Sequence, residues 1–137
     1  MKPTAFIDDL KRRVFCRLGV SGIHGVGVFA IRPIPAGINP MMGRRKENWV
    51  EVLAPLIRND PHLPDALKKL VVDMCPEDAG VFWCPGYSLN EIGIAWYLNH
   101  ADTPNMEERD GDFYSIRDIA EGEELTVNYA TYGNLNL

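Results

Sequence analysis

Cysteine and histidine are both scarce in this 137-residue chain, which contains three of each. The cysteines are Cys16, Cys75 and Cys84. Their number is odd and no two of them form a CxxC pair, so neither a disulfide framework nor a zinc site is indicated. We expect buried thiols in a reducing compartment. His24 and His62 are not at metal-ligand spacing from His100, so no metal is expected.

Positive charge and long apolar runs are also in short supply. The 14 basic residues face 19 acidic ones, a net charge of −5, whereas a general nucleic-acid binder carries a basic excess. No apolar run approaches the ~18 residues of a membrane span, and the N-terminus has charges in place of a secretory apolar region. We expect a soluble intracellular protein with no direct nucleic-acid or membrane partner. The negative charge leaves room for a basic peptide, because a negatively lined groove steers cations inward.

Both ends of the chain are predicted to be β-rich. "FAIRPIPAG" at 29–37 and "YSIRDIAEG" at 114–122 share one frame, and each predicts a strand followed by a glycine turn. Coincidence between two short strand–turn units is the alternative explanation. "RRVFCRLGV" and "ELTVNY" predict two further strands. At this length, with no linker or low-complexity segment, we expect one domain over residues 1–137.

The middle of the chain, at about 41–86, is predicted to be a variable helical insert. "ENWVEVLAPLIRND" has helical spacing, although Pro55 would interrupt that helix. "PDALKKLVVDM" predicts a second helix. "RNDPHLPD" and "CPEDAGVFWCPGY" are expected to be loops. Ser88 and Glu91 form a capping-box pattern that predicts a short helix ending at about Leu98, just before Asn99 and His100.

Three stretches could carry chemistry, and each has an ordinary structural explanation. The GxG of "SGIHGVGVFA" suits a hairpin turn, and a strand follows it, so a dinucleotide-binding interpretation fails. In "NHADTPN", His100 alone is typical of a satisfied polar residue. "EGEELTVNYATYGN" is typical of a solvated turn, followed by a strand that ends at Tyr129.

Taken together and in this order, "GIHGVGVFAIRPIPAG", "YLNHADTPN" and "IRDIAEGEELTVNY" resemble the SET-domain protein-lysine methyltransferases. The resemblance covers about residues 13–38 and 88–132 and leaves the middle unmatched. It implies an α+β, mainly β fold, a β-clip of short curved sheets with a helical insert and a C-terminal knot-like threading. It also implies transfer of a methyl group from S-adenosylmethionine to a lysine of a protein, with histones as frequent substrates of the family.

The resemblance assigns roles to individual residues. Gly25, Val26 and Gly27 would contact the cofactor through their backbone, Asn99 through its side chain and His100 through its main chain. Tyr129 matches the catalytic tyrosine. Aromatic residues should line the lysine channel, because they desolvate its stem. The channel candidates are Tyr87 and Tyr132.

Eight residues follow Tyr129 and none is cysteine, so the zinc-binding cap of many relatives is expected to be missing. The tail, a second subunit in a homodimer or the substrate would then complete the site. Two alternatives to an active enzyme remain. One is a catalytically weak or inactive SET-fold module that binds a partner, for example through the acidic "MEERDGD" loop. The other is a cofactor-binding domain that acts within an oligomer.

Overall fold

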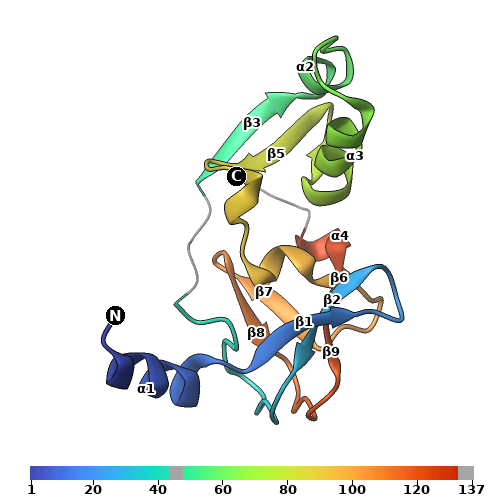
Figure 1. Cartoon of the computed structure of the whole chain (residues 1–137). Coiled ribbons are helices and arrows are strands. Elements are labelled where there is room, and N and C mark those ends of the chain that lie inside the picture. Colours follow the sequence, from blue (N-terminus) through green and yellow to red (C-terminus); the bar gives the residue numbers. More distant parts are fainter. Residues whose placement is uncertain (44–47, 133–137) are drawn as a thin grey trace. The chain divides into compact units, whose positions relative to one another are not determined.

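The computed structural model describes residues 1–43 and 48–132, with the side chain of Tyr132 excepted (Figure 1). The chain divides into two compact units. The first unit combines Met1–Arg45 with Gly93–Leu137, and the second is Lys46–Ile92. None of the helices in the described ranges has the length and apolar content of a membrane-spanning segment.

The first unit is built on a four-stranded sheet with the order β1-β2-β9-β6. Its strands are β1 (Cys16–Val20), β2 (Val26–Ala30), β9 (Glu124–Val127) and β6 (Asn99–His100). The β1–β2 and β2–β9 pairs are antiparallel, whereas β6 runs parallel to β9. A separate hairpin joins β7 (Met106–Arg109) to β8 (Asp112–Ser115). Helix α1 (Pro3–Arg13), the 3₁₀ segment η2 (Ile94–Tyr97) and the short helix α4 (Tyr129–Tyr132) complete this unit.

The core of the first unit gathers apolar side chains from both flanks of the sequence. Val28 of β2 and Leu125 of β9 are fully buried and stand opposite each other in the register. Ile34, Met106, Ile119 and Val127 join the same cluster. Because the segments that supply this core are about 100 residues apart in sequence, the sheet closes only after both ends of the chain have met.

The two similar segments at 29–37 and 114–122 lie against each other. Ile34 and Ile119, which occupy the same place in the shared frame, form an antiparallel bridge. Ala30 accepts a hydrogen bond from the N–H of Gly122, and Ser115 accepts one from Gly37. Gly37 and Gly122 have positive φ, at 84° and 89° respectively. The prediction of two strand–turn units is therefore confirmed. Each unit donates to the other the same backbone hydrogen bonds that it accepts, so an approximate twofold axis relates the two units.

The second unit has its own small sheet and core. Its sheet order is β3-β5-β4, formed by β3 (Trp49–Leu53), β5 (Val81–Pro85) and β4 (Glu77–Asp78). Helices α2 (Ala54–Arg58) and α3 (Asp65–Met74) and the 3₁₀ segment η1 (Leu89–Glu91) accompany it. Ala54, Cys75 and Phe82 form its buried centre.

The helix expected for "ENWVEVLAPLIRND" is wrong in its first half. Residues 49–53 form β3, which pairs along its full length with β5. Pro55 explains the division, because proline is accepted in the first turn of a helix and disfavoured in its interior. Here it stands in the first turn of α2. The helix expected for "PDALKKLVVDM" is confirmed as α3.

The loop expected for "CPEDAGVFWCPGY" is also wrong, because this stretch contains the β4–β5 hairpin. Its turn uses Ala79 and Gly80, both with positive φ, at 50° and 79°, as a tight two-residue hairpin turn requires. The insert is therefore part sheet and part helix. In the "SLNE" region, Ser88 caps η1 through Asn90. The single helix expected there is divided into η1 and η2, because Ile92 between them is extended.

Candidate active site

Three segments that are distant in sequence meet on the sheet of the first unit. β9 pairs with β2 through Phe29 and Glu124, and with β6 through Asn99 and Thr126. The β1–β2 turn that holds the GxG, the Asn-His segment and the chain leading to Tyr129 are thereby brought together.

The Asn99 side chain joins these segments. It is 7% exposed, and its Nδ2 atom lies 3.0 Å from the carbonyl oxygen of His24 and 3.2 Å from that of Val26. Ser21 Oγ and Glu124 Oε2 are at 3.1 and 2.9 Å from the same nitrogen. Four acceptors around two N–H bonds fix which end of the amide is nitrogen. Within residues 1–43 and 48–132, no hydrogen bond to Asn99 Oδ1 is formed.

Ser21 and Glu124 are members of the site that the sequence analysis did not identify. The Ser21 hydroxyl lies 2.7 and 2.9 Å from the two carboxylate oxygens of Glu124. It also accepts the N–H of Ile23 at 2.9 Å and that of His24 at 3.3 Å, which holds the turn in shape. The acidic run containing Glu124 was interpreted as a solvated turn. Its position directly before the apolar run of β9 was the available signal that it belongs to a strand.

The GxG places a glycine where no side chain fits. Gly27 is buried, and a Cβ there would collide with the Glu124 carboxylate and lie 3.1 Å from Asn99 Nδ2. Gly25 differs, with a φ of +48° and open space around its Cβ position. Its carbonyl accepts the N–H of Ser21 at 2.8 Å. The two glycines therefore serve different needs, one for close packing and one for the turn.

We expect Gly27→Ala to destabilise the protein by about 1–3 kcal/mol, because the added methyl displaces the Glu124 carboxylate from its hydrogen bonds. Urea denaturation measures this change. Gly22→Ala is the matched control, since a Cβ at Gly22 meets nothing within 4 Å. Equal unfolding midpoints for the two variants would show that the close contact at Gly27 has no energetic weight.

His100 links the end of β6 to the start of α4. Its Nδ1 accepts the backbone N–H of Tyr129 at 3.1 Å, so the ring proton resides on Nε2, which lies 2.9 Å from Asp102 Oδ1. These two bonds fix the tautomer of the neutral ring. The rings of His100 and Tyr129 are 5.3 Å apart between centroids. The His100 side chain thus holds Tyr129 in place.

The Tyr129 hydroxyl points back to the Asn-His segment. It donates to the carbonyl oxygen of Leu98 at 2.6 Å. Partial burial, and then the negative charge of Glu124, raise the pKa of Tyr129 above its ordinary value. The phenol is therefore neutral at physiological pH, with its proton directed at Leu98.

Asn105 fixes the turn behind the site. It is 3% exposed, its Oδ1 accepts the N–H of Thr126 at 2.8 Å, and its Nδ2 donates to the Glu124 carbonyl at 2.8 Å. A side-chain amide therefore takes the place of a neighbouring strand beside β9.

The residues predicted from the sequence fall into two groups. Gly25, Val26, Gly27, Asn99, His100 and Tyr129 all lie in the first unit, in the region just described. Of the two channel candidates, Tyr87 belongs to the second unit, and the side chain of Tyr132 lies outside the described part of the chain. Their role stays a prediction. The described residues hold no cluster of three or more histidine, cysteine or acidic side chains that could bind a metal.

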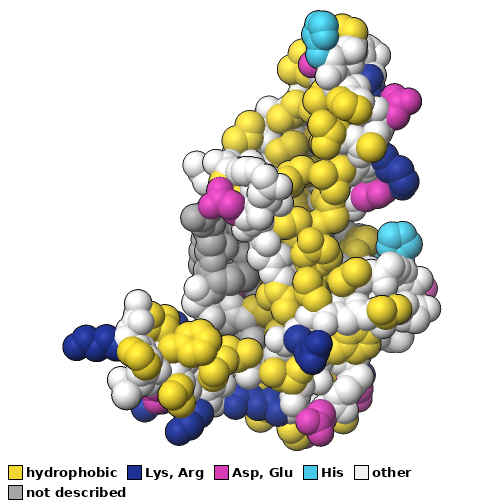
Figure 2. Space-filling model, viewed as in Figure 1, with side chains coloured by type: hydrophobic (Ala, Val, Ile, Leu, Met, Phe, Trp, Pro, Cys, Tyr) yellow, Lys and Arg dark blue, Asp and Glu magenta, His cyan; other side chains and the backbone are white. Residues whose placement is uncertain are grey.

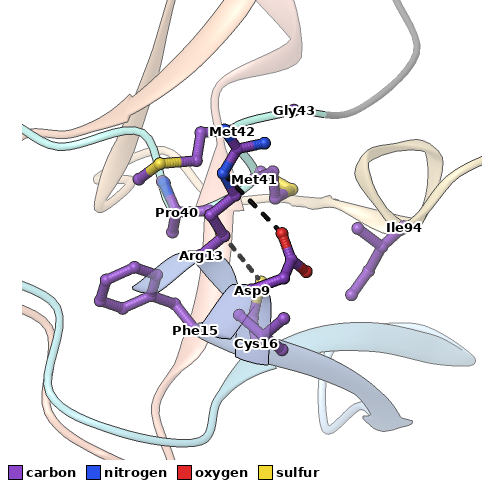
Figure 3. Close-up of a pocket in the computed structure, with 10 residues that line it drawn as sticks. Asp9, Arg13, Phe15, Cys16, Pro40, Met41, Met42, Gly43 and Ile94 are labelled. Atoms are coloured by element: carbon purple, nitrogen blue, oxygen red, sulfur yellow. Dashed lines mark hydrogen bonds and ion pairs between the residues drawn. The ribbon is translucent and has the colours of Figure 1, made fainter. Parts of the chain in front are cut away.

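A separate cleft of about 270 Å³ lies beside the end of α1 (Figure 3). It is lined by Asp9 and Arg13 of the helix, by the start of β1 and by residues 40–43. None of the predicted site residues lines it. Apolar side chains also gather on the exposed face of α1 (Figure 2), where Phe6, Ile7 and Leu10 are 44% to 54% exposed.

Comparisons with known proteins agree with this arrangement. The SET domain family model matches residues 25–130. The chain is similar to apo Chaetomium thermophilum Polycomb Repressive Complex 2 carrying two Ezh2 mutations, with 21% identity and a TM-score of 0.56 over 85% of this chain and 15% of that chain. The same complex bound to GSK126 gives 21% identity and a TM-score of 0.53, over 85% and 16%.

A Plasmodium falciparum protein described as a candidate histone methyltransferase has 19% identity and a TM-score of 0.47, over 85% of this chain and 94% of its own. No curated protein sequence matches significantly. The structural likenesses show the fold, in which mainly short strands form small sheets, as predicted from the sequence. The family match spans more than half of the chain and includes the GxG, the Asn-His segment and Tyr129. The chain belongs to the SET-domain family.

Proposed function

We propose that this protein transfers a methyl group from S-adenosylmethionine to the side-chain amine of a lysine in a protein substrate. The observation that carries the proposal is the position of the Tyr129 hydroxyl. It lies 2.6 Å from the carbonyl oxygen of Leu98, the residue directly before Asn99. In a module that only bound partners, this hydroxyl would serve only its hydrogen bond to Leu98.

The polar atoms around Asn99 suit the proposed cofactor. Asn99 Oδ1 is an acceptor in a largely buried residue that receives no hydrogen bond from the described residues, and the ammonium group of S-adenosylmethionine is a matching donor. Open space around Gly25 leaves its backbone accessible to a ligand. We assign Gly25, Val26, Gly27 and the main chain of His100 to the same ligand. When bound, S-adenosylmethionine supplies a methyl group activated by its sulfonium charge.

Tyr129 would orient the lysine amine. The amine must be neutral to attack, and burial together with a nearby positive charge lowers the pKa of a lysine from its reference value of about 10.4. Because the Tyr129 proton is donated to Leu98, its oxygen would meet the amine as a hydrogen-bond acceptor. Alignment of this kind, with water excluded, contributes up to ~7–11 kcal/mol.

We assign Tyr87 and Tyr132 to the lysine channel, and a histone is one protein that could present the lysine. The net charge of −5 suits a basic peptide around that lysine. A homodimer remains compatible with these assignments.

The test is incubation of the purified protein with methyl-labelled S-adenosylmethionine and a set of lysine-containing histone and ribosomal proteins. We expect label in a protein band, with methyl-lysine as the only labelled amino acid after hydrolysis. Cofactor binding without transfer to any of these proteins would favour the SET-fold interaction module in place of the enzyme.

A further inference from the structure

Glu124 has a carboxylate that is satisfied in hydrogen bonds and unbalanced in charge. It accepts from Ser21 Oγ at 2.7 Å and from Asn99 Nδ2 at 2.9 Å. Both donors are neutral. In the described part of the chain, no lysine, arginine or histidine lies within ion-pair distance of it. The residue is only partly exposed, so solvent screens its charge less than it screens the charge of a fully exposed carboxylate.

The neighbouring acidic residues differ from Glu124. Glu123 pairs with Arg117 at 3.0 Å. Asp102 is 96% exposed and lies 2.9 Å from His100 Nε2. Glu124 therefore differs from both: it is partly shielded from solvent and has no cationic partner among the described residues.

Glu124 also contacts the residues that we assign to the cofactor. Its carboxylate lies against Asn99 and occupies the space beside Gly27 that a Cβ would need. Its charge is felt at the Tyr129 hydroxyl, where it contributes, after burial, to the raised pKa. A ligand bound to this surface would therefore be close enough to sense its charge.

Resting on the proposed function, we propose that Glu124 is the counter-charge of the cofactor site and makes the site prefer a sulfonium ligand to the corresponding neutral thioether. The two adenosyl ligands differ by one methyl group and one positive charge. On transfer, the lysine nitrogen forms a bond to the methyl carbon, and the electrons of the carbon–sulfur bond stay on the sulfur. The thioether product then lacks the charge that Glu124 attracts, so its release is favoured over that of the substrate form.

The test is calorimetric measurement of the Kd for S-adenosylmethionine and for S-adenosylhomocysteine, with the native protein, Glu124→Gln and Glu121→Gln. Glu121 is exposed, lies in the turn before β9 and gives the same change in net charge. We expect the native protein to bind the sulfonium more tightly. This preference is the Kd for S-adenosylhomocysteine divided by the Kd for S-adenosylmethionine. Glu124→Gln should reduce this ratio by about 3- to 10-fold, the effect of one charge pair in a partly solvated site. Glu121→Gln should leave the ratio unchanged.

Equal weakening of both ligands by Glu124→Gln would reduce Glu124 to a structural role and overturn the inference. Glu124→Asp, which keeps the charge, should retain most of the preference. If the glutamine variant does not fold, the two Kd values of the native protein at low and high salt test the inference. The preference for the sulfonium should shrink between about 50 mM and about 500 mM salt. A preference independent of salt would overturn the inference alone, whereas native protein that binds neither ligand would overturn the proposed function.

Discussion

Tyr129→Phe is expected to slow methyl transfer by about 10²- to 10³-fold, the usual effect of removing one precisely placed polar group from an active site. The ring would remain packed beside His100, because the centroid contact at 5.3 Å does not involve the hydroxyl. The backbone N–H of Tyr129 would still donate to His100 Nδ1. Only the oxygen beside Leu98 is lost, so cofactor affinity should stay within about twofold while kcat falls.

Single-turnover transfer measured beside calorimetric cofactor binding separates these two effects. Tyr114→Phe is the control, since it removes a tyrosine hydroxyl from β8, where the ring stacks under Arg109 at 4.0 Å. Unchanged turnover in Tyr129→Phe would remove Tyr129 from the chemical step.

The raised pKa of Tyr129 also predicts how the stability of the protein depends on pH. Its folded pKa is above the ordinary 10, so its contribution to stability is present below pH 10 and is lost as the pH rises through the folded value.

Asn99→Ala is expected to cost about 2–4 kcal/mol of stability and to weaken cofactor binding at least tenfold. The substitution removes the donor shared by the carbonyls of His24 and Val26 and by the Glu124 carboxylate. These acceptors would be left partly buried without that donor, which is more costly than the loss of an exposed hydrogen bond. The β1–β2 turn would lose its connection to β6.

Urea denaturation gives the stability change, and titration of S-adenosylmethionine gives the affinity. Asn90→Ala serves as the control, because Asn90 is an exposed residue of η1 in the second unit. Asn99→Asp provides a sharper comparison. It would bring a second carboxylate against Glu124 and should destabilise more than alanine does. An aspartate variant as stable as the native protein would contradict the hydrogen-bond assignment of Asn99.

Local sequence patterns predicted the elements whose stability is local. Helix α3 was found from its apolar spacing, and the two glycine turns at Gly37 and Gly122 from their frame. Residues 49–53 were misassigned because five apolar-rich residues before a proline suit either a strand or a helix. Only pairing with β5 decides between them. The β4–β5 hairpin was missed for a similar reason, since its turn uses Ala79, a residue with no intrinsic preference for positive φ.

The candidate site was predictable in its motifs and not in its connections. Asn99, His100 and Tyr129 were singled out because their segments resemble a family signature. The parallel pairing of β6 with β9 joins residues 25 or more positions apart, and no local periodicity encodes such a contact. The contacts of Glu124 with Ser21 and with Asn99 depend on the pairing of β9 with both β2 and β6. A glutamate in an acidic run is typical of a solvated turn, and only the register opposite Phe29 places its side chain beside Asn99.

Titration of S-adenosylmethionine into the purified native protein tests the central claim most directly, because it requires no knowledge of the acceptor protein. The proposed function predicts saturable binding at one site per chain. No detectable heat at high micromolar cofactor, from protein shown to be folded by its circular dichroism, would contradict it.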